Sequence, residues 1–308
     1  MEIKKISIVG MGALGILFGN YFTEKLGREA VSFILNKDRI EKYNREKVTC
    51  NGKVCDFKVI DEDEKGEIAD LLIMAVKGTC LAEGIKTARN HVGENTLIIS
   101  VLNGISSEEV IGAEFGKDKV LYCVAQGMDA VKIKNNFTYS NFGELRIGIP
   151  KDEEYKRDKL NSVVQLFDRI NFPYTLEDDI IHRIWSKFML NVGINQTVMI
   201  FEGTYGTVQK SGRPREIMIN AMKEVIELAS YENVKLTEDD LNGYLNLVDT
   251  LQGSGMPSMR QDGLAHRYSE VELFSGTVLR LAEKHGLSMK TNEFLYNRIK
   301  EIERSYNK

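Results

Sequence analysis

The chain has 308 residues, 43% of them hydrophobic and 28% charged, which is ordinary for a globular protein and leaves room for two domains. A formal net charge of −4 excludes a strongly basic nucleic-acid-binding surface, and the composition excludes collagen-like and largely disordered proteins. No apolar run approaches the roughly 20 residues that cross a bilayer, and the first residues lack a signal-peptide core. Four cysteines and four histidines without metal-ligand spacing favour reduced thiols and no metal. We therefore expect a soluble, cytoplasmic protein without membrane or nucleic-acid partners.

The first half of the chain alternates short apolar runs with helical patterns. Each run is too uniformly apolar to leave one face in water, which is typical of a parallel sheet covered on both sides. The strands that we expect are Ile6–Val9, Val31–Leu35, Leu71–Val76, Leu97–Leu102 and Val120–Val124. Helical periodicity at Leu14–Leu26 and Leu81–Val92 completes the pattern of a doubly wound α/β sheet.

Two hairpins are predicted beside this sheet, and a helical region follows. Asn51-Gly52 marks a tight turn, and a second hairpin is expected from Phe137 to Ile149 with its turn near Asn141–Gly143. From Asp178 onward helical patterns dominate. We predict an α/β, Rossmann-type doubly wound domain in residues 1–176 and an all-α domain in residues 177–308, with a small-molecule site between them.

A glycine-rich turn follows the first predicted strand. It reads Gly10, Met11, Gly12, Ala13, Leu14 and Gly15, the pattern G-x-G-x-x-G between a strand and a helix. The first glycine permits the tight turn, the second lets main-chain amides approach a pyrophosphate, and the third allows close helix packing. Because unpaired amides at a helix N-terminus favour anions, this motif predicts dinucleotide binding.

The end of the second strand bears on which dinucleotide is bound. An NAD-binding protein usually places an acidic residue there to hold the ribose 2′-hydroxyl. This chain has Asn36, Lys37, Asp38 and Arg39 instead. Asn36 does not repel a 2′-phosphate and Lys37 or Arg39 would pair with it, so NADPH is favoured over NADH. The alternative is that both bases are merely solvated at a helix start.

Two later strand ends point at the same edge of the sheet. Lys77 follows one predicted strand, and Asn103 with Gly104 follows the next. Carboxyl ends of strands face the ligand in open α/β sheets, so both residues are candidates for the cofactor site. A solvated lysine and a simple turn are the alternatives.

A polar stripe marks the helix predicted over Ile180–Ile200. Lys187, Asn191 and Asn195 are spaced four apart, so they share one face of a helix that is apolar on both flanks. Unpaired buried polar groups cost roughly 1–3 kcal/mol each, so the stripe either satisfies itself or lines a ligand cleft, which we favour. Further along, Ser269 to Glu272 reads as a helix start with Ser269 as N-cap and Glu272 completing a capping box, and Glu270 is a candidate counter-charge for Lys187.

Together these residues resemble the ketopantoate reductases (2-dehydropantoate 2-reductases) of the wider 6-phosphogluconate-dehydrogenase-like group. The resemblance covers essentially the whole chain. It rests on the glycine turn, Val76-Lys77, Leu102-Asn103-Gly104, the Lys187-x3-Asn191-x3-Asn195 stripe, and Ser258-Met259-Arg260-Gln261-Asp262 followed by Ser269-Glu270-Val271-Glu272.

The resemblance implies an oxidoreductase that reduces a 2-keto acid with NADPH, on the route to pantothenate. By the family pattern, Lys187 is the general acid, and Glu270 holds the nascent hydroxyl and orients Lys187. Asn191, Asn195 and Ser258 would hold substrate, Asn103 would lie between cofactor and substrate, and Lys77 would lie near the cofactor.

Three departures from the family pattern leave alternatives open. Asn36 stands where a basic residue is common, Tyr205 where an asparagine often precedes Gly206, and Gly263 where a larger residue is usual. The alternatives are a related NAD(P)H reductase of another 2-keto acid, for which Tyr205 is the motive, and a dinucleotide sensor without turnover. The residues do not specify the oligomeric state: late helices such as Val271–His285 form either the face of a homodimer or only the core of the second domain.

Overall fold

The computed structural model describes residues 1–129 and 131–307 of the chain. Its contacts divide the chain into two compact units, Met1–Ile180 (unit 1) and Ile181–Lys308 (unit 2). The sequence-based boundary lies after residue 176. Unit 1 is built on a β-sheet and unit 2 is helical, which confirms the expected fold class of an α/β domain followed by an all-α domain.

Unit 1 contains an eight-stranded sheet with the order β12-β11-β8-β7-β6-β1-β2-β5. The strands are β1 Ile6–Val9, β2 Val31–Leu35, β5 Lys58–Asp61, β6 Ala69–Met74, β7 Val92–Ser100, β8 Val120–Gln126, β11 Glu144–Gly148 and β12 Tyr174–Leu176. Neighbours from β5 through β8 are parallel. All five predicted strands are therefore present, although β6 and β7 end at residues 74 and 100, earlier than expected.

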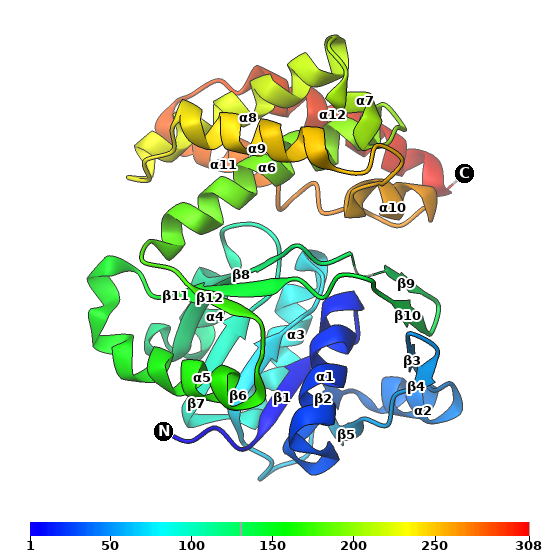
Figure 1. The fold of residues 1–308 in the computed structure, drawn as a ribbon, viewed down its shortest axis with the longest axis vertical. Coiled ribbons are helices and arrows are strands. Elements are labelled where there is room, and N and C mark those ends of the chain that lie inside the picture. The colour runs from blue at the N-terminus through cyan, green and yellow to red at the C-terminus, as the bar shows by residue number, and fades with distance from the viewer. Residues whose placement is uncertain (130, 308) are drawn as a thin grey trace. The chain divides into compact units, whose positions relative to one another are not determined.

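Helices cover both faces of this sheet (Figure 1). The helices are α1 Ala13–Leu26, α2 Lys37–Arg45, α3 Leu81–Ala88, α4 Ser107–Phe115 and α5 Arg157–Ile170. One core joins α1 and α5 to one face, and a second core joins α3 and α4 to the other. Because side chains alternate along each strand, β1 supplies Ile6 and Ile8 to the first core and Val9 to the second.

The second predicted hairpin is wrong. Residues 136–138 form β10 in a separate sheet, whereas β11 pairs antiparallel with β8 in the main sheet. Gly143 has φ +70 and lies against the main chain of Gln126, so residues 141–143 are the connection into β11 rather than a hairpin turn. The main sheet is consequently mixed at one edge.

A small four-stranded sheet has the order β4-β3-β10-β9. Its strands are β3 Thr49–Cys50, β4 Lys53–Val54, β9 Val131–Ile133 and β10 Asn136–Thr138. The predicted hairpin at Asn51-Gly52 is confirmed, with both residues at positive φ, as the tight hairpin turn requires. Parallel pairing of β3 with β10 joins this hairpin to a segment far along the chain.

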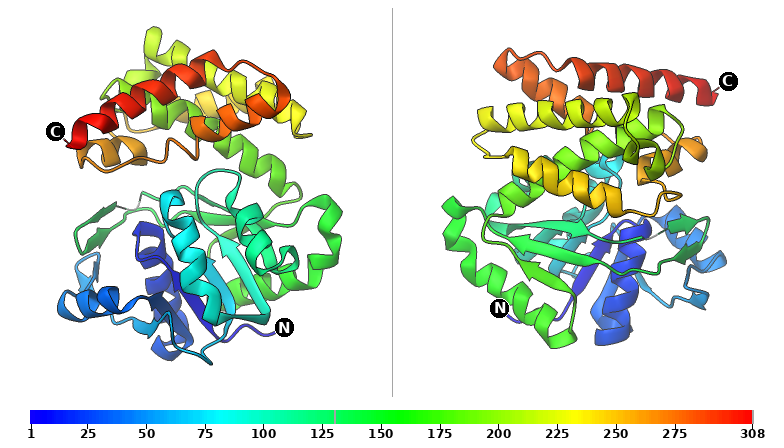
Figure 2. Two further views of the ribbon diagram at one scale, coloured as in Figure 1. Left: turned by 180° about the vertical axis from the view of Figure 1, so that it is seen from behind. Right: turned by 45° about the horizontal axis from the view of Figure 1, so that its top comes forward.

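Unit 2 is built around α6 Ile180–Ile200, at the predicted bounds. The other helices are α7 Tyr205–Gln209, α8 Arg213–Tyr231, α9 Glu238–Thr250, α10 Ser258–Leu264, α11 Ser275–His285 and α12 Lys290–Arg304. Figure 2 shows these helices from two further sides. Within the described residues, none of the helices combines the length and apolar character needed to cross a membrane.

The helix start predicted at Ser269 is also wrong. Residues 271–274 form a turn, and α11 begins at Ser275. Both Ser269 donors bind the carboxylate of Glu303, and Tyr296 and Lys300 bind that of Glu272. These distant partners replace the local capping box.

Candidate active-site residues

The glycine turn of unit 1 allows no side chain at two of its positions. Gly10 has φ +107, and a Cβ there would lie 2.5 Å from the carbonyl oxygen of Ala75 at the end of β6. A Cβ on Gly15 would lie 2.0 Å from the carbonyl oxygen of Gly10. The turn is therefore packed against its own main chain and against the neighbouring strand.

Gly12 is different, because it is exposed and has room beside it. A methyl group on Gly12 would have the Ala75 carbonyl oxygen as its nearest neighbour, at 3.6 Å. Gly12 is the N-cap of α1, and among the described residues neither a side-chain cap nor a first-turn acid occupies that helix start. Open amides at a helix N-terminus suit a pyrophosphate, so the turn fits a dinucleotide.

An open pocket with about 310 Å³ of empty space adjoins this turn. Its lining is Val9, Gly10, Ile34, Leu35, Asn36, Arg39, Val76, Cys80, Glu83, Gly84 and Thr87. Arg39, one of the two bases predicted to pair with a 2′-phosphate, belongs to the lining, and so does Asn36, which was predicted not to repel it. The Asn36 side chain also caps α2, because its oxygen accepts a hydrogen bond from the Arg39 amide at 3.0 Å. Lys37 is exposed in the first turn of α2.

Lys77 and Asn103 follow adjacent strands of the sheet. Lys77 is exposed, and its carbonyl oxygen accepts a hydrogen bond from Cys80 in the 3-10 helix Gly78–Cys80. Asn103 is half-buried beside Gly104, whose φ is +97. The ends of β1, β6 and β7 are joined by hydrogen bonds from Ala75 to Val9 and from Val101 to Met74, so both residues follow the edge that carries the glycine turn.

A buried polar chain underlies the Asn103 loop. Ser100 donates to Ser107 at 2.8 Å, and Ser107 donates to the carboxylate of Glu108 at 2.9 Å. Glu108 is 6% exposed, and burial raises the pKa of its carboxyl to about 7. A titrating group thus lies in the first turn of α4, directly after the predicted cofactor loop.

In unit 2 the structure brings three predicted substrate residues together. Asn195 is 5% exposed, and its side-chain amide donates to the side-chain oxygen Oδ1 of Asn191 at 3.2 Å. The side-chain oxygen Oδ1 of Asn195 accepts from the Ser258 hydroxyl at 3.3 Å and from the Met259 main-chain amide at 3.4 Å. Asn195 thereby joins the middle of α6 to the N-terminus of α10. We call Asn191, Asn195 and Ser258 the amide cluster.

Lys187 is half-buried on the same face of α6, two turns before Asn195. Glu270 is half-buried within the turn segment that precedes α11. The pairing of these two side chains stays a prediction.

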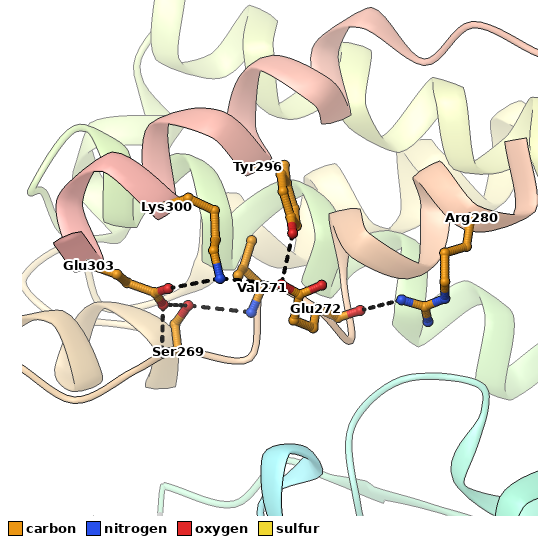
Figure 3. A network of polar contacts seen from close by, with 7 residues as sticks. All are labelled: Ser269, Val271, Glu272, Arg280, Tyr296, Lys300 and Glu303. Atoms are coloured by element: carbon orange, nitrogen blue, oxygen red, sulfur yellow. Dashed lines mark hydrogen bonds and ion pairs between the residues drawn. The ribbon is translucent and has the colours of Figure 1, made fainter. Parts of the chain in front are cut away.

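The segment that carries Glu270 is fixed from both sides by α12 (Figure 3). Before it, the Ser269 amide and hydroxyl donate to Glu303, which is 3% exposed, at 2.7 and 2.6 Å. After it, the Glu272 carboxylate accepts from the Tyr296 hydroxyl at 2.8 Å and from Lys300 at 3.3 Å. The main chain on either side of Glu270 is thus held by contacts with residues of α12.

Tyr205 and Gly263 are the two positions of unit 2 that depart from the family pattern, and the structure shows what surrounds each of them. Tyr205 begins α7, its amide donates to the carbonyl oxygen of Gly255, and its ring would lie 3.0 Å from a Cβ on Gly255. Burial raises the pKa of its hydroxyl. A Cβ on Gly263 would make ordinary contacts at 3.4 Å or more, so the larger residue usual there is compatible with this fold.

Sequence reasoning missed one wall of the pocket and one donor. Cys80, Gly84 and Thr87 line the pocket from α3 and the turn before it, and their helical spacing next to the third strand was a usable signal. The Met259 amide, which donates to Asn195, had no signal because it belongs to the main chain.

Comparison with family models and with curated proteins points to the same family in both cases. The family model described as "Ketopantoate reductase PanE/ApbA" matches residues 6–151, and its C-terminal counterpart matches residues 179–303. A 2-dehydropantoate 2-reductase of Aquifex aeolicus is 27% identical, covering 97% of this chain and 96% of that protein.

Among solved structures, D-mandelate dehydrogenase with NADH and anilino(oxo)acetate has a TM-score of 0.86 at 20% identity, covering 99% and 100% of the two chains. A dimeric ketopantoate reductase of Staphylococcus aureus has a TM-score of 0.79 at 20% identity, covering 98% and 99%. These two likenesses support the fold.

Proposed function

The chain belongs to the ketopantoate reductase family, and from that premise we propose that it reduces 2-dehydropantoate to pantoate with NADPH. The observation that carries the proposal is the amide cluster. Asn191 and Asn195 lie on the face of α6 that also carries Lys187, and hydrogen bonds join them to one another and to Ser258 of α10. Amide and hydroxyl groups beside a lysine suit a 2-keto acid, which offers a carboxylate and a carbonyl oxygen as acceptors.

In the proposed reaction the substrate receives a hydride from the dinucleotide and a proton from Lys187. When bound, the reduced dinucleotide supplies the hydride that reaches the keto carbon. The Lys187 ammonium donates a proton to the carbonyl oxygen, so the C=O bond becomes a C–OH group and Lys187 is left neutral. Glu270 accepts a hydrogen bond from the new hydroxyl and orients Lys187. The amide cluster holds the substrate, while Asn103 and Lys77 contribute to the cofactor side.

A second candidate is a reductase of a bulkier or aromatic 2-keto acid. The packing of Tyr205 on Gly255, close in sequence to Ser258, is the observation that favours it. The fold neighbour D-mandelate dehydrogenase supports this candidate, because its structure holds NADH and anilino(oxo)acetate, an oxo acid with an aromatic ring. Pocket walls that differ by one side chain change substrate preference readily.

Steady-state oxidation of NADPH and of NADH with 2-dehydropantoate, phenylglyoxylate and short aliphatic 2-keto acids separates these candidates. We expect the highest kcat/KM with 2-dehydropantoate and NADPH. Preference for phenylglyoxylate favours the second candidate. Dinucleotide binding without turnover on any keto acid favours a sensor.

We also propose a homodimer, by analogy with the dimeric relative. Size-exclusion chromatography of the same sample tests this oligomeric state.

A further inference from the structure

A lysine from the small sheet reaches the glycine turn. Lys132, in β9, donates a hydrogen bond to the main-chain carbonyl oxygen of Met11 at 2.5 Å. The two residues are 121 positions apart in the chain. Lys132 is half-buried, so its ammonium is held at the turn rather than extended into water.

Two more bases accompany Lys132 at this place. Arg39 lines the pocket together with Gly10, the neighbour of Met11, and Lys42 follows Arg39 by one turn of α2. Burial lowers the pKa of Lys132, and the positive charges of Lys42 and Arg39 lower it further. Within residues 1–129 and 131–307, no carboxylate forms an ion pair with any of these three bases.

The fold holds Lys132 in place through the small sheet. The β9–β10 hairpin pairs with β3, and the Thr49 amide donates to Asn135 while the Asn51 amide donates to Phe137, each at 2.9 Å. Phe137 is fully buried in the main core of unit 1. This sheet therefore fixes the Lys132 ammonium beside the glycine turn, where the positive charges of Arg39 and Lys42 repel it.

We propose that Lys132, together with Arg39 and Lys42, binds the 2′-phosphate of the adenosine ribose and so determines a preference for NADPH over NADH. The position supports this ligand, because the turn after β1 and the residues after β2 flank the adenosine ribose in dinucleotide-binding sheets. A phosphate offsets the mutual repulsion of three bases and accepts charge-assisted hydrogen bonds from each. The inference rests on the proposed function only in its choice of a dinucleotide as ligand.

Equilibrium binding of NADPH and NADH, measured by calorimetry without a keto acid, tests the proposal. Lys132→Met should weaken NADPH binding at least about tenfold and leave NADH binding within about twofold, because only NADPH carries the phosphate. Lys132→Arg should retain most of the discrimination. Lys53→Met, which removes an exposed lysine from β4 of the same sheet, is the matched control and should change neither affinity.

Three results would overturn the proposal. They are equal weakening of both dinucleotides by Lys132→Met, unchanged affinities in that variant, and a wild-type protein that binds NADH as tightly as NADPH. If Lys132→Met does not fold, Arg39→Met must produce the same selective loss, because the exposed Arg39 side chain lines the pocket that adjoins the glycine turn. A protein that binds NADPH more tightly than NADH but reduces no keto acid would contradict the proposed function and leave this proposal intact. Failure of one can therefore be told apart from failure of the other.

Discussion

The glycine turn of unit 1 and the amide cluster of unit 2 are built in opposite ways. The turn is made of main chain, and its fit depends on the absence of side chains at Gly10 and Gly15. The cluster is made of side chains that α6 and α10 present to one another. A side chain at Gly10 or Gly15 must displace main chain and so disturb the fold, whereas the cluster can lose a side chain and its function while the fold persists. This difference explains how one fold can keep its cofactor and change its substrate.

The largest effect is expected where a methyl group meets the main chain. Gly15→Ala places a Cβ 2.0 Å from the Gly10 carbonyl oxygen, so the turn must move and the free energy of unfolding should fall by more than about 3 kcal/mol. Gly12→Ala, with its nearest contact at 3.6 Å, should lose no more than about 1 kcal/mol. Urea denaturation measures both, and equal losses would contradict a turn packed on its own main chain.

The next largest effect is a change in the free energy of unfolding with pH, caused by the Glu108 carboxyl of unit 1. The pKa of Glu108 is about 7 in the folded protein against an ordinary value of 4.5, so folding favours the protonated carboxyl. Stability from this group is present below about pH 4.5 and is lost as the pH rises through 7, by up to roughly 3 kcal/mol. The amide cluster consists of two asparagines and a serine, none of which titrates in this range, so the cluster offers no counterpart to Glu108.

Glu108→Gln tests this asymmetry, because glutamine stays neutral. The variant should match the wild type at pH 4 and below, and exceed it in free energy of unfolding at pH 8. Glu109→Gln, an exposed neighbour in the same turn, is the control. A pH profile identical in wild type and Glu108→Gln would rule out this carboxyl as the source.

A smaller effect should separate stability from function within α6. Asn195→Ala removes the acceptor for Ser258 and Met259, and Gln196→Ala removes a buried acceptor for the Ser275 amide. Each should cost about 1–3 kcal/mol. Only Asn195→Ala should raise KM for the keto acid, measured by NADPH oxidation. A matching rise in KM for Gln196→Ala would make the cluster merely structural.

The features read correctly from the sequence were those set by local pattern. Strand β1 and the glycine turn follow from uniform apolarity ended by Gly10, and α6 follows from helical periodicity over residues 180–200. The polar stripe also predicted that Asn191 and Asn195 lie together, because spacing by four residues fixes neighbours on a helix.

The features missed were those set by distant partners. Residues 137–149 contain two strand-like runs, but β10 pairs with β3 and β11 pairs with β8, a choice that no local pattern encodes. The capping box at Ser269 failed because both donors of Ser269 bind the buried carboxylate of Glu303 from α12 instead. Lys132 was not singled out because its role arises only where β9 meets the glycine turn.

The proposed division of roles gives dinucleotide binding to unit 1 and proton donation to Lys187 in unit 2. Lys187→Met, assayed for turnover of 2-dehydropantoate and for NADPH affinity in the same preparation, tests it most directly. We expect kcat to fall at least about 10²-fold while the dissociation constant for NADPH stays unchanged. Lys210→Met, which alters an exposed lysine of unit 2, should leave both unchanged. Full turnover in Lys187→Met, or loss of NADPH binding, would contradict this division of roles.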